Sequence, residues 1–352
     1  MTPAETSLNE RVERLLESVD EPFLVTNPTN VFYLSGFRSS NAALLVDRER
    51  VRLFTDFRYA GAARAVEGVD FVQTQRSLVQ GIAQNVEGRV AFEAATMTYA
   101  NWMTLKDAGL ELVPTQGVVE KLRAVKGGDE LEKIREACRI TDAVYAAIAE
   151  ERFVGRPERD LAWRMEQLFH EQGADSLAFE LIVGSGPTAA LPHARATDRL
   201  VEANTTVVID AGCYVDGYVS DCTRTFATGE LPDDLARAYE VCSRAQRSAL
   251  AAVQPGAAGK DVDAVSRELI EEAGWGEKYG HGLGHGVGLL VHEAPTLRPE
   301  SEDVLEPGNV VTVEPGIYLE GEGGVRIEDL VVVTESGCEI LTQFTKELVT
   351  VS

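Results

Sequence analysis

Residues 207–226 of the chain read VVIDAGCYVDGYVSDCTRTF. Two apolar, β-branched runs flank an Asp-Gly pair, which predicts two antiparallel strands joined by a tight turn. If the turn is centred before Asp216, Asp210 and Asp221 lie directly opposite each other, and if it is centred after Asp216, they are diagonal neighbours. Both registers put the two carboxylates on one face, where they repel each other unless a cation lies between them. Two unrelated aspartates at strand ends explain this segment equally well.

A second pair of apolar strands surrounds a glycine-rich turn at residues 320–324, which read EGEGG. Each arm carries one glutamate among β-branched and apolar residues, since Glu314 precedes the turn and Glu328 follows it. Burial of an unpaired carboxylate is costly, and a bound metal ion removes that cost. The two arms together favour a metal site over two isolated buried carboxylates.

Three of the five histidines lie in residues 280–293, which read GHGLGHGVGLLVHE. The alternating glycines disfavour a helix, and in an extended chain His281 and His285 share one face while bare backbone lines the other. A ligand can then approach closely. We expect His170, in a helical stretch without a motif, to be structural. His193 follows a Gly-Ser-Gly-Pro loop of the kind that lies over a site.

Four carboxylates and one imidazole suit divalent ions of the hard or borderline type, with Mn(II) or Co(II) expected first and Zn(II) or Fe(II) as alternatives. Four negative ligands balance two divalent cations, and such a pair lowers the pKa of a water between the ions, so that it attacks near neutral pH. The single-zinc HExxH motif is absent, because His292-Glu293 is followed by Ala-Pro-Thr. The sequence therefore predicts a dinuclear hydrolase site.

The order and spacing of these residues resemble the pita-bread metallopeptidases, in the branch of Xaa-Pro aminopeptidase and Xaa-Pro dipeptidase. The resemblance implies an α+β fold, with a pita-bread catalytic domain over residues 126–352 and a smaller creatinase- and prolidase-like α/β domain over residues 1–125. Residues 30–37, NVFYLSGF, carry the match in the smaller domain. The metal ligands implied by the resemblance are Asp210, Asp221, His285, Glu314 and Glu328.

The resemblance also implies how these five residues share two ions. Asp210 would bind one ion, whereas Asp221 and Glu328 would contact both. His285 and Glu314 would complete the shell of the other ion. Glu314 would in addition relay a proton as a general acid and base.

Further residues match groups around the ions in the same family. His193 and His292 match histidines that hydrogen-bond the scissile carbonyl and the tetrahedral intermediate, and both count as catalytic residues. His281 matches a histidine of the substrate pocket. Arg326, grouped with the substrate-binding residues, and Thr223 match side chains that orient the ligating carboxylates.

The substrate is predicted from the apolar residues Phe179, Leu181 and Val291, which would form a slot for a proline ring. In many relatives a basic residue follows the proline of the His-Glu-x-Pro segment and suits the carboxylate of a dipeptide. Here Thr296 takes that place and Arg298 lies two residues later. The sequence therefore favours an Xaa-Pro aminopeptidase acting on peptides with proline at the second position, with Xaa-Pro dipeptidase (prolidase) as the alternative.

Three other classes remain as more distant alternatives. A methionine aminopeptidase-like enzyme would share the ligands, but such enzymes usually lack the extra N-terminal domain. A metal-free creatinase-type amidinohydrolase and a non-catalytic pita-bread binding protein would not need the complete ligand set, so its presence disfavours both.

The remaining sequence predicts two domains. Before residue 125, amphipathic helical stretches alternate with short apolar runs, as is typical of an α/β domain. Its predicted strands are residues 23–26, 42–46, 51–55, 71–74, 90–93 and 112–114. Paired glycines and an acidic helix start within residues 125–129 mark the boundary. The predicted helices of the second domain are residues 129–152, 158–172, 231–253 and 261–273.

Composition excludes several partners. The net charge of −24 repels nucleic acid, and no basic stretch offsets it. The five cysteines include no CxxC pair, which argues against disulfides and thiolate zinc. No apolar run approaches the roughly 18 residues of a membrane span, and the N-terminus has no signal-peptide pattern. We therefore expect a cytoplasmic protein without membrane partners, and the resemblance adds the expectation of a homodimer.

Overall fold

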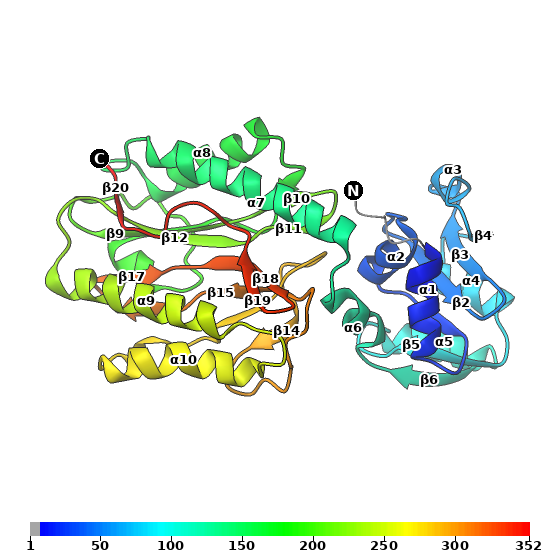
Figure 1. Cartoon of the computed structure of the whole chain (residues 1–352). Coiled ribbons are helices and arrows are strands. Elements are labelled where there is room, and N and C mark those ends of the chain that lie inside the picture. Colours follow the sequence, from blue (N-terminus) through cyan, green and yellow to red (C-terminus); the bar gives the residue numbers. More distant parts are fainter. Residues whose placement is uncertain (1–7) are drawn as a thin grey trace. The chain divides into compact units, whose positions relative to one another are not determined.

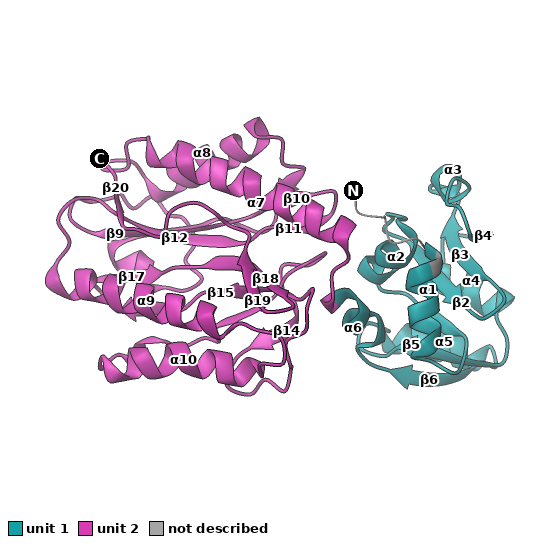
Figure 2. Cartoon of the chain, in the orientation of Figure 1, with its two compact units in different colours: residues 1–123 teal, residues 124–352 magenta. Residues whose placement is uncertain are grey.

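The computed structural model describes residues 8–352, and the chain divides into two compact units, residues 1–123 and 124–352 (Figures 1 and 2). The first unit is a mixed sheet with strand order β4-β3-β2-β1-β5-β6 and helices around it. Strand β2 runs antiparallel to both neighbours, whereas the pairs β1–β5, β5–β6 and β3–β4 are parallel.

The strands of this unit are β1 (Phe23–Val25), β2 (Ala42–Val46), β3 (Val51–Asp56), β4 (Asp70–Thr74), β5 (Arg89–Glu93) and β6 (Glu111–Thr115). Its helices are α1 (Leu8–Glu17), α2 (Pro28–Ser35), α3 (Ala60–Ala63), α4 (Leu78–Asn85), α5 (Tyr99–Asp107) and α6 (Val118–Ala124). All six predicted strands are present, because alternating β-branched and apolar runs are reliable signals for strands of a buried sheet.

The second unit has short strands between two pairs of helices (Figure 1). Its helices are α7 (Gly128–Ala149), α8 (Glu158–Glu171), α9 (Asp233–Ala252) and α10 (Gly259–Glu272), with 3-10 turns η1 (Gly186–Ala190) and η2 (Gly276–Lys278). All four predicted helices are therefore present. The helix α7 begins with a capping interaction, since the Gly127 amide donates to the Glu130 carboxylate at 2.9 Å. None of the helices in residues 8–352 is long and apolar enough to cross a membrane.

The strands of this unit form four small sheets. A four-stranded sheet has the order β20-β12-β9-β8, a five-stranded sheet β14-β13-β15-β18-β19, a three-stranded sheet β11-β10-β7, and β16 pairs with β17. The first strands are β7 (Ser176–Leu177), β8 (Ile182–Ser185), β9 (Thr206–Ala211), β10 (Cys213–Val215), β11 (Tyr218–Val219), β12 (Cys222–Ala227) and β13 (Gly284–Gly286). The others are β14 (Glu293–Leu297), β15 (Val310–Val313), β16 (Gly316–Leu319), β17 (Gly323–Arg326), β18 (Asp329–Thr334), β19 (Gly337–Ile340) and β20 (Val349–Thr350).

The first hairpin, residues 206–227, carries Asp210 and Asp221 on its two arms. Asp216 and the glycine after it have φ angles of 48° and 85°, as in the type I′ turn that Asp-Gly favours. The turn is thus centred after Asp216, and Asp210 pairs with Thr223. Asp221 directly precedes β12 and is the diagonal neighbour of Asp210, which confirms the second of the two predicted registers.

The second hairpin, residues 310–334, changes sheets at its two glutamates. β15 pairs with β18, and β16 pairs with β17 as a separate sheet. Glu314 and Glu328 lie in the breaks between these pairs. The Glu328 backbone amide donates instead to the Thr223 carbonyl of the first hairpin, at 3.1 Å. The breaks therefore release both glutamates from regular strand pairing, and the one at Glu328 joins the two hairpins.

The close approach of the first hairpin to itself at Gly212 gives a stability prediction. A Cβ atom on Gly212 would lie 1.9 Å from the Ser220 carbonyl oxygen. Gly212→Ala should lower the free energy of unfolding by about 1 to 3 kcal/mol, the usual cost of overpacking. The control Gly337→Ala, in open space within β19, should change it by less than about 0.5 kcal/mol. Urea denaturation of both variants measures the difference, and equal stabilities would contradict the steric argument.

Candidate metal centre and active-site cavity

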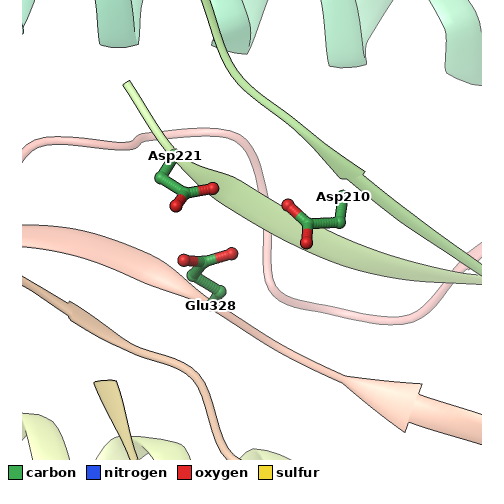
Figure 3. Close-up of side chains that lie close together, drawn as sticks. All are labelled: Asp210, Asp221 and Glu328. Carbon is green, nitrogen blue, oxygen red and sulfur yellow. The ribbon is translucent and has the colours of Figure 1, made fainter. Parts of the chain in front are cut away.

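Three carboxylates converge in the second unit, as Figure 3 shows. Asp210 comes from β9, Asp221 from the residue before β12 and Glu328 from the break before β18. One oxygen of each lies within 4.8 Å of the others. We call these three residues the carboxylate cluster. They come from both hairpins, so the cluster forms only when the two hairpins are packed together.

Hydrogen bonds satisfy only part of the cluster. Asp210 Oδ2 accepts from the Arg326 guanidinium at 2.7 Å, and Glu328 Oε2 accepts from the Thr223 hydroxyl at 2.7 Å. Asp210 Oδ1 is buried and has no hydrogen-bond partner among the described residues 8–352. A buried acceptor without a partner costs free energy, and a bound cation would satisfy it.

Burial and like charge disfavour ionisation of the cluster. Burial raises the pKa of Asp221 and of Glu328 well above the usual range, and the neighbouring carboxylates raise both pKa values further. Burial also raises the pKa of Asp210, although the Arg326 charge opposes the shift. A divalent cation reverses this balance, because it favours the charged form of every carboxylate beside it. The donor set therefore fits divalent metal ions.

His285 and Glu314 extend the cluster on one side. The Nε2 atom of His285 lies 3.2 Å from Glu314 Oε1 and 3.8 Å from Asp221 Oδ2. Its other ring nitrogen is 3.1 Å from the Gly286 carbonyl oxygen, which directs Nε2 toward the carboxylates. Burial raises the pKa of Glu314, but the His285 ring outweighs it and lowers that pKa to about 2. All five predicted ligands are thus connected.

A cavity of about 730 Å³ opens onto these residues. The predicted residues His193, His281, His292, Phe179 and Val291 line its walls together with the five acidic and imidazole side chains and Arg326. Figure 3 shows only the three carboxylates at the centre of the group.

The prediction for Leu181 is wrong. Leu181 is only 5% exposed and packs in the core with residues of α7 and α8, and the next residue, Ile182, lines the cavity instead. β8 begins at Ile182, and consecutive side chains of an extended segment point to opposite faces, so Leu181 faces the core and Ile182 faces the cavity. The sequence did not fix where this strand begins.

A hydrogen-bonded chain connects the cavity wall with the carboxylate cluster. His281 Nε2 lies 2.9 Å from the Tyr318 hydroxyl, which accepts from Arg326 at 3.0 Å, and Arg326 donates to Asp210. Tyr318 was not among the predicted residues. The sequence feature that points to Tyr318 is Gly316, two residues earlier, because a Cβ atom at Gly316 would lie 2.5 Å from the Tyr318 hydroxyl.

His292 and His193 lie on the cavity wall near the ligands. The ring centroids of His292 and His285 are 4.2 Å apart. Burial lowers the pKa of His292, and the nearby charge of His285 lowers it further. A neutral imidazole beside the cluster can donate one hydrogen bond into the cavity.

Comparison with known proteins identifies the family. The model of metallopeptidase family M24 matches residues 132–335, and the model of the creatinase/prolidase N-terminal domain matches residues 11–125. The chain belongs to metallopeptidase family M24. It is a metallo-exopeptidase with a pita-bread catalytic domain and a creatinase-type N-terminal domain, so the predicted family, fold class and enzyme class are confirmed.

Individual relatives are similar over almost the whole chain. The Xaa-Pro dipeptidase of Pyrococcus furiosus is 36% identical over 351 residues, which cover 97% of this chain and 100% of that one. An uncharacterized peptidase of Bacillus subtilis is 41% identical over 335 residues, 93% of this chain and 94% of that one.

Solved structures give the same picture. An Xaa-Pro dipeptidase from Bacillus anthracis has a TM-score of 0.94 at 38% identity, covering 98% of this chain and 100% of that one. An X-Pro aminopeptidase from Thermotoga maritima has a TM-score of 0.88 at 33% identity, covering 97% and 100%. The relatives named dipeptidase support the alternative that the sequence ranked second better than the aminopeptidase.

Removing one carboxylate from the cluster should change the Tm, relative to the parent protein, in opposite directions with and without metal. Without metal, Asp221→Asn removes one of three crowded charges, so its Tm should equal or exceed that of the parent. With Mn(II) at 100 times its Kd, the parent should gain about 2.7 kcal/mol and the variant much less, so the order of the Tm values reverses.

Thermal unfolding with and without Mn(II) measures both effects. The control Asp216→Asn changes an exposed carboxylate in the turn of the same hairpin, and it should respond to Mn(II) as the parent does. A full response to Mn(II) in Asp221→Asn would contradict a role of Asp221 in holding the ions.

Proposed function

We propose that the chain is an Xaa-Pro dipeptidase, which uses two divalent ions to hydrolyse the peptide bond before a C-terminal proline. The observation that carries the proposal is the convergence of four carboxylates and one imidazole on one wall of a cavity. The proposed ligands are Asp210, Asp221, His285, Glu314 and Glu328. The dipeptidase names of similar proteins support the choice of reaction.

The proposed chemistry divides between the ions and the side chains. When bound, two divalent ions supply positive charge and lower the pKa of water at the site. Glu314 takes the proton of the attacking water on its carboxylate and passes it to the nitrogen of the leaving proline. The Thr312 hydroxyl donates to Glu314 Oε1 at 3.0 Å and thereby orients this carboxylate.

The proposed catalytic histidines act on the carbonyl group. His292 and His193 donate hydrogen bonds to the carbonyl oxygen as negative charge develops on it. The position of His292 against the ring of the proposed ligand His285 supports this role, because a substrate carbonyl that approaches the proposed metal ligands also lies close to His292. Phe179 and Val291 provide apolar surface for the proline ring.

Arg298 supports the preference for dipeptides. It lines the cavity, is exposed, and forms no ion pair among residues 8–352. Arg195, the other exposed arginine of the cavity, has Glu180 as a partner at 3.5 Å. We propose that Arg298 binds the C-terminal carboxylate of the substrate through charge-assisted hydrogen bonds.

Xaa-Pro aminopeptidase remains the second candidate because of Thr296. The Thr296 hydroxyl and backbone amide both bond to Asp303, at 3.0 and 2.7 Å. This position therefore offers no cation to a dipeptide carboxylate, and the similar Thermotoga maritima structure is named an aminopeptidase.

We further propose Mn(II) or Co(II) as the ions, since carboxylate-rich sites favour them over softer metals. All five cysteines are free thiols, which supports the proposed cytoplasmic location. The proposed homodimer rests on the family resemblance.

The reaction is tested with metal-free protein and peptides of increasing length. We expect no activity without metal, recovery with Mn(II) or Co(II), and cleavage of Ala-Pro but not of Ala-Pro-Ala or longer peptides. Chromatography of the products measures cleavage. Cleavage of the longer peptides would reassign the chain to the aminopeptidases, and no cleavage of any peptide with any ion would contradict both functions.

The role of Arg298 gives a separate prediction. Arg298→Gln should raise the KM for Ala-Pro about 10-fold or more, since a charge-assisted hydrogen bond contributes about 1.5 to 3 kcal/mol, while kcat changes little. Arg195→Gln is the control, and its KM should stay near that of the parent because Glu180 already neutralises Arg195. Equal effects of the two substitutions would argue against a specific carboxylate site at Arg298.

A further inference from the structure

A second charged group lies next to the carboxylate cluster but outside the cavity. Arg224, Asp329 and Lys346 have side chains that are 3%, 0% and 20% exposed. Asp329 accepts from Arg224 at 2.9 Å on one oxygen and contacts Lys346 on the other. Neither Arg224 nor Asp329 lines the cavity. Successive side chains of β12 alternate, so Thr223 faces the cluster and Arg224 faces the opposite side.

The guanidinium of Arg224 has an acceptor for each of its five N–H groups. Nη1 lies 3.0 Å from the Thr223 carbonyl oxygen and also contacts the Glu328 carbonyl oxygen. Nη2 donates to Asp329 and to the Phe344 carbonyl at 2.7 Å. Nε lies 3.0 Å from the Thr345 carbonyl oxygen. One side chain therefore joins the first hairpin, the second hairpin and the C-terminal segment.

Two of these acceptors belong to residues of the candidate metal centre. The Glu328 carbonyl is on a proposed ligand, and the Thr223 carbonyl is on the residue whose hydroxyl bonds to the Glu328 carboxylate. Arg224 thus holds the backbone of both hairpins from behind. Its bonds are to the backbone carbonyls of these residues and not to the carboxylate oxygens of the cluster, so Arg224 does not compete with ions for those oxygens.

We infer that Arg224 is a positioning residue that fixes Glu328 relative to Asp210 and Asp221 by joining the two hairpins, with Asp329 as its counter-charge. The inference rests on the proposed metal-binding function of the cluster. Crowded carboxylates repel, so in the metal-free protein the hairpins need a bond that resists their separation. Lysine cannot replace the arginine, because its three donors on one nitrogen do not span carbonyls from three segments.

The test compares Arg224→Lys with a control of similar burial. Glu158 is fully buried, and its hydrogen-bond partners are not proposed metal ligands; they are Ser185, Thr188 and Thr197. Both Arg224→Lys and Glu158→Gln should lower the Tm. Only Arg224→Lys should weaken Mn(II) binding, by about 10- to 100-fold, as is usual when partners of metal ligands are changed.

Calorimetric titration of metal-free protein with Mn(II) measures the affinity, and kinetics with Ala-Pro at saturating Mn(II) measure KM. The KM of Arg224→Lys should match that of the parent, because Arg224 does not line the cavity. Parent-like Mn(II) affinity in Arg224→Lys, or an equal loss in Glu158→Gln, would overturn the inference and leave the proposed function intact. A parent protein that binds no divalent ion would overturn the proposed function itself.

A second variant applies if Arg224→Lys does not fold. Asp329→Asn keeps the carbonyl contacts of Arg224 but removes its counter-charge. We expect weaker Mn(II) binding than in the parent with an unchanged KM. Parent-like Mn(II) affinity in a folded Asp329→Asn protein would overturn the inference.

Discussion

Repulsion among three closely spaced carboxylates is the constraint on which the catalytic unit depends. Asp210, Asp221 and Glu328 place oxygens within 4.8 Å of one another, and in the part of the chain that the structure describes one Asp210 oxygen has no hydrogen-bond partner. Arg326 bonds to one oxygen of Asp210 and Thr223 bonds to one oxygen of Glu328, and the single arginine charge does not balance three carboxylates. Such an arrangement is unfavourable alone and becomes favourable when divalent ions bind.

The architecture serves this constraint by repeating one arrangement. Helices α7 and α8 precede the first hairpin, and α9 and α10 precede the second (Figure 1). Each hairpin carries two of the proposed carboxylate ligands, and Asp221, Glu314 and Glu328 lie where strand pairing is interrupted. Interrupted strands can face each other across the centre, whereas continuous ladders would direct these residues along one sheet. The sequence shows no matching repeat, because the two halves share an arrangement of elements rather than residues.

Local sequence signals indicated most of the fold and most of the site residues that line the cavity. The Asp-Gly pair limited the first hairpin to two registers, and the glutamates beside the EGEGG turn indicated the second. Contacts between distant segments could not be predicted from local signals, such as the bond from Arg224 to Asp329, which are 105 residues apart. The omission of Tyr318 and the wrong prediction for Leu181 have the same cause. Both positions depend on where a strand begins and on which segments the strand contacts. The sequence and the relatives also favour substrates of different length. Thr296 led the sequence analysis to prefer an aminopeptidase, whereas the names of the relatives favour a dipeptidase.

The most direct test of the account is an anomalous difference map from crystals of the protein grown with Mn(II). The account predicts two peaks per chain, enclosed by the side chains of Asp210, Asp221, His285, Glu314 and Glu328. A map without peaks at this position, or with peaks coordinated by other residues, would contradict it.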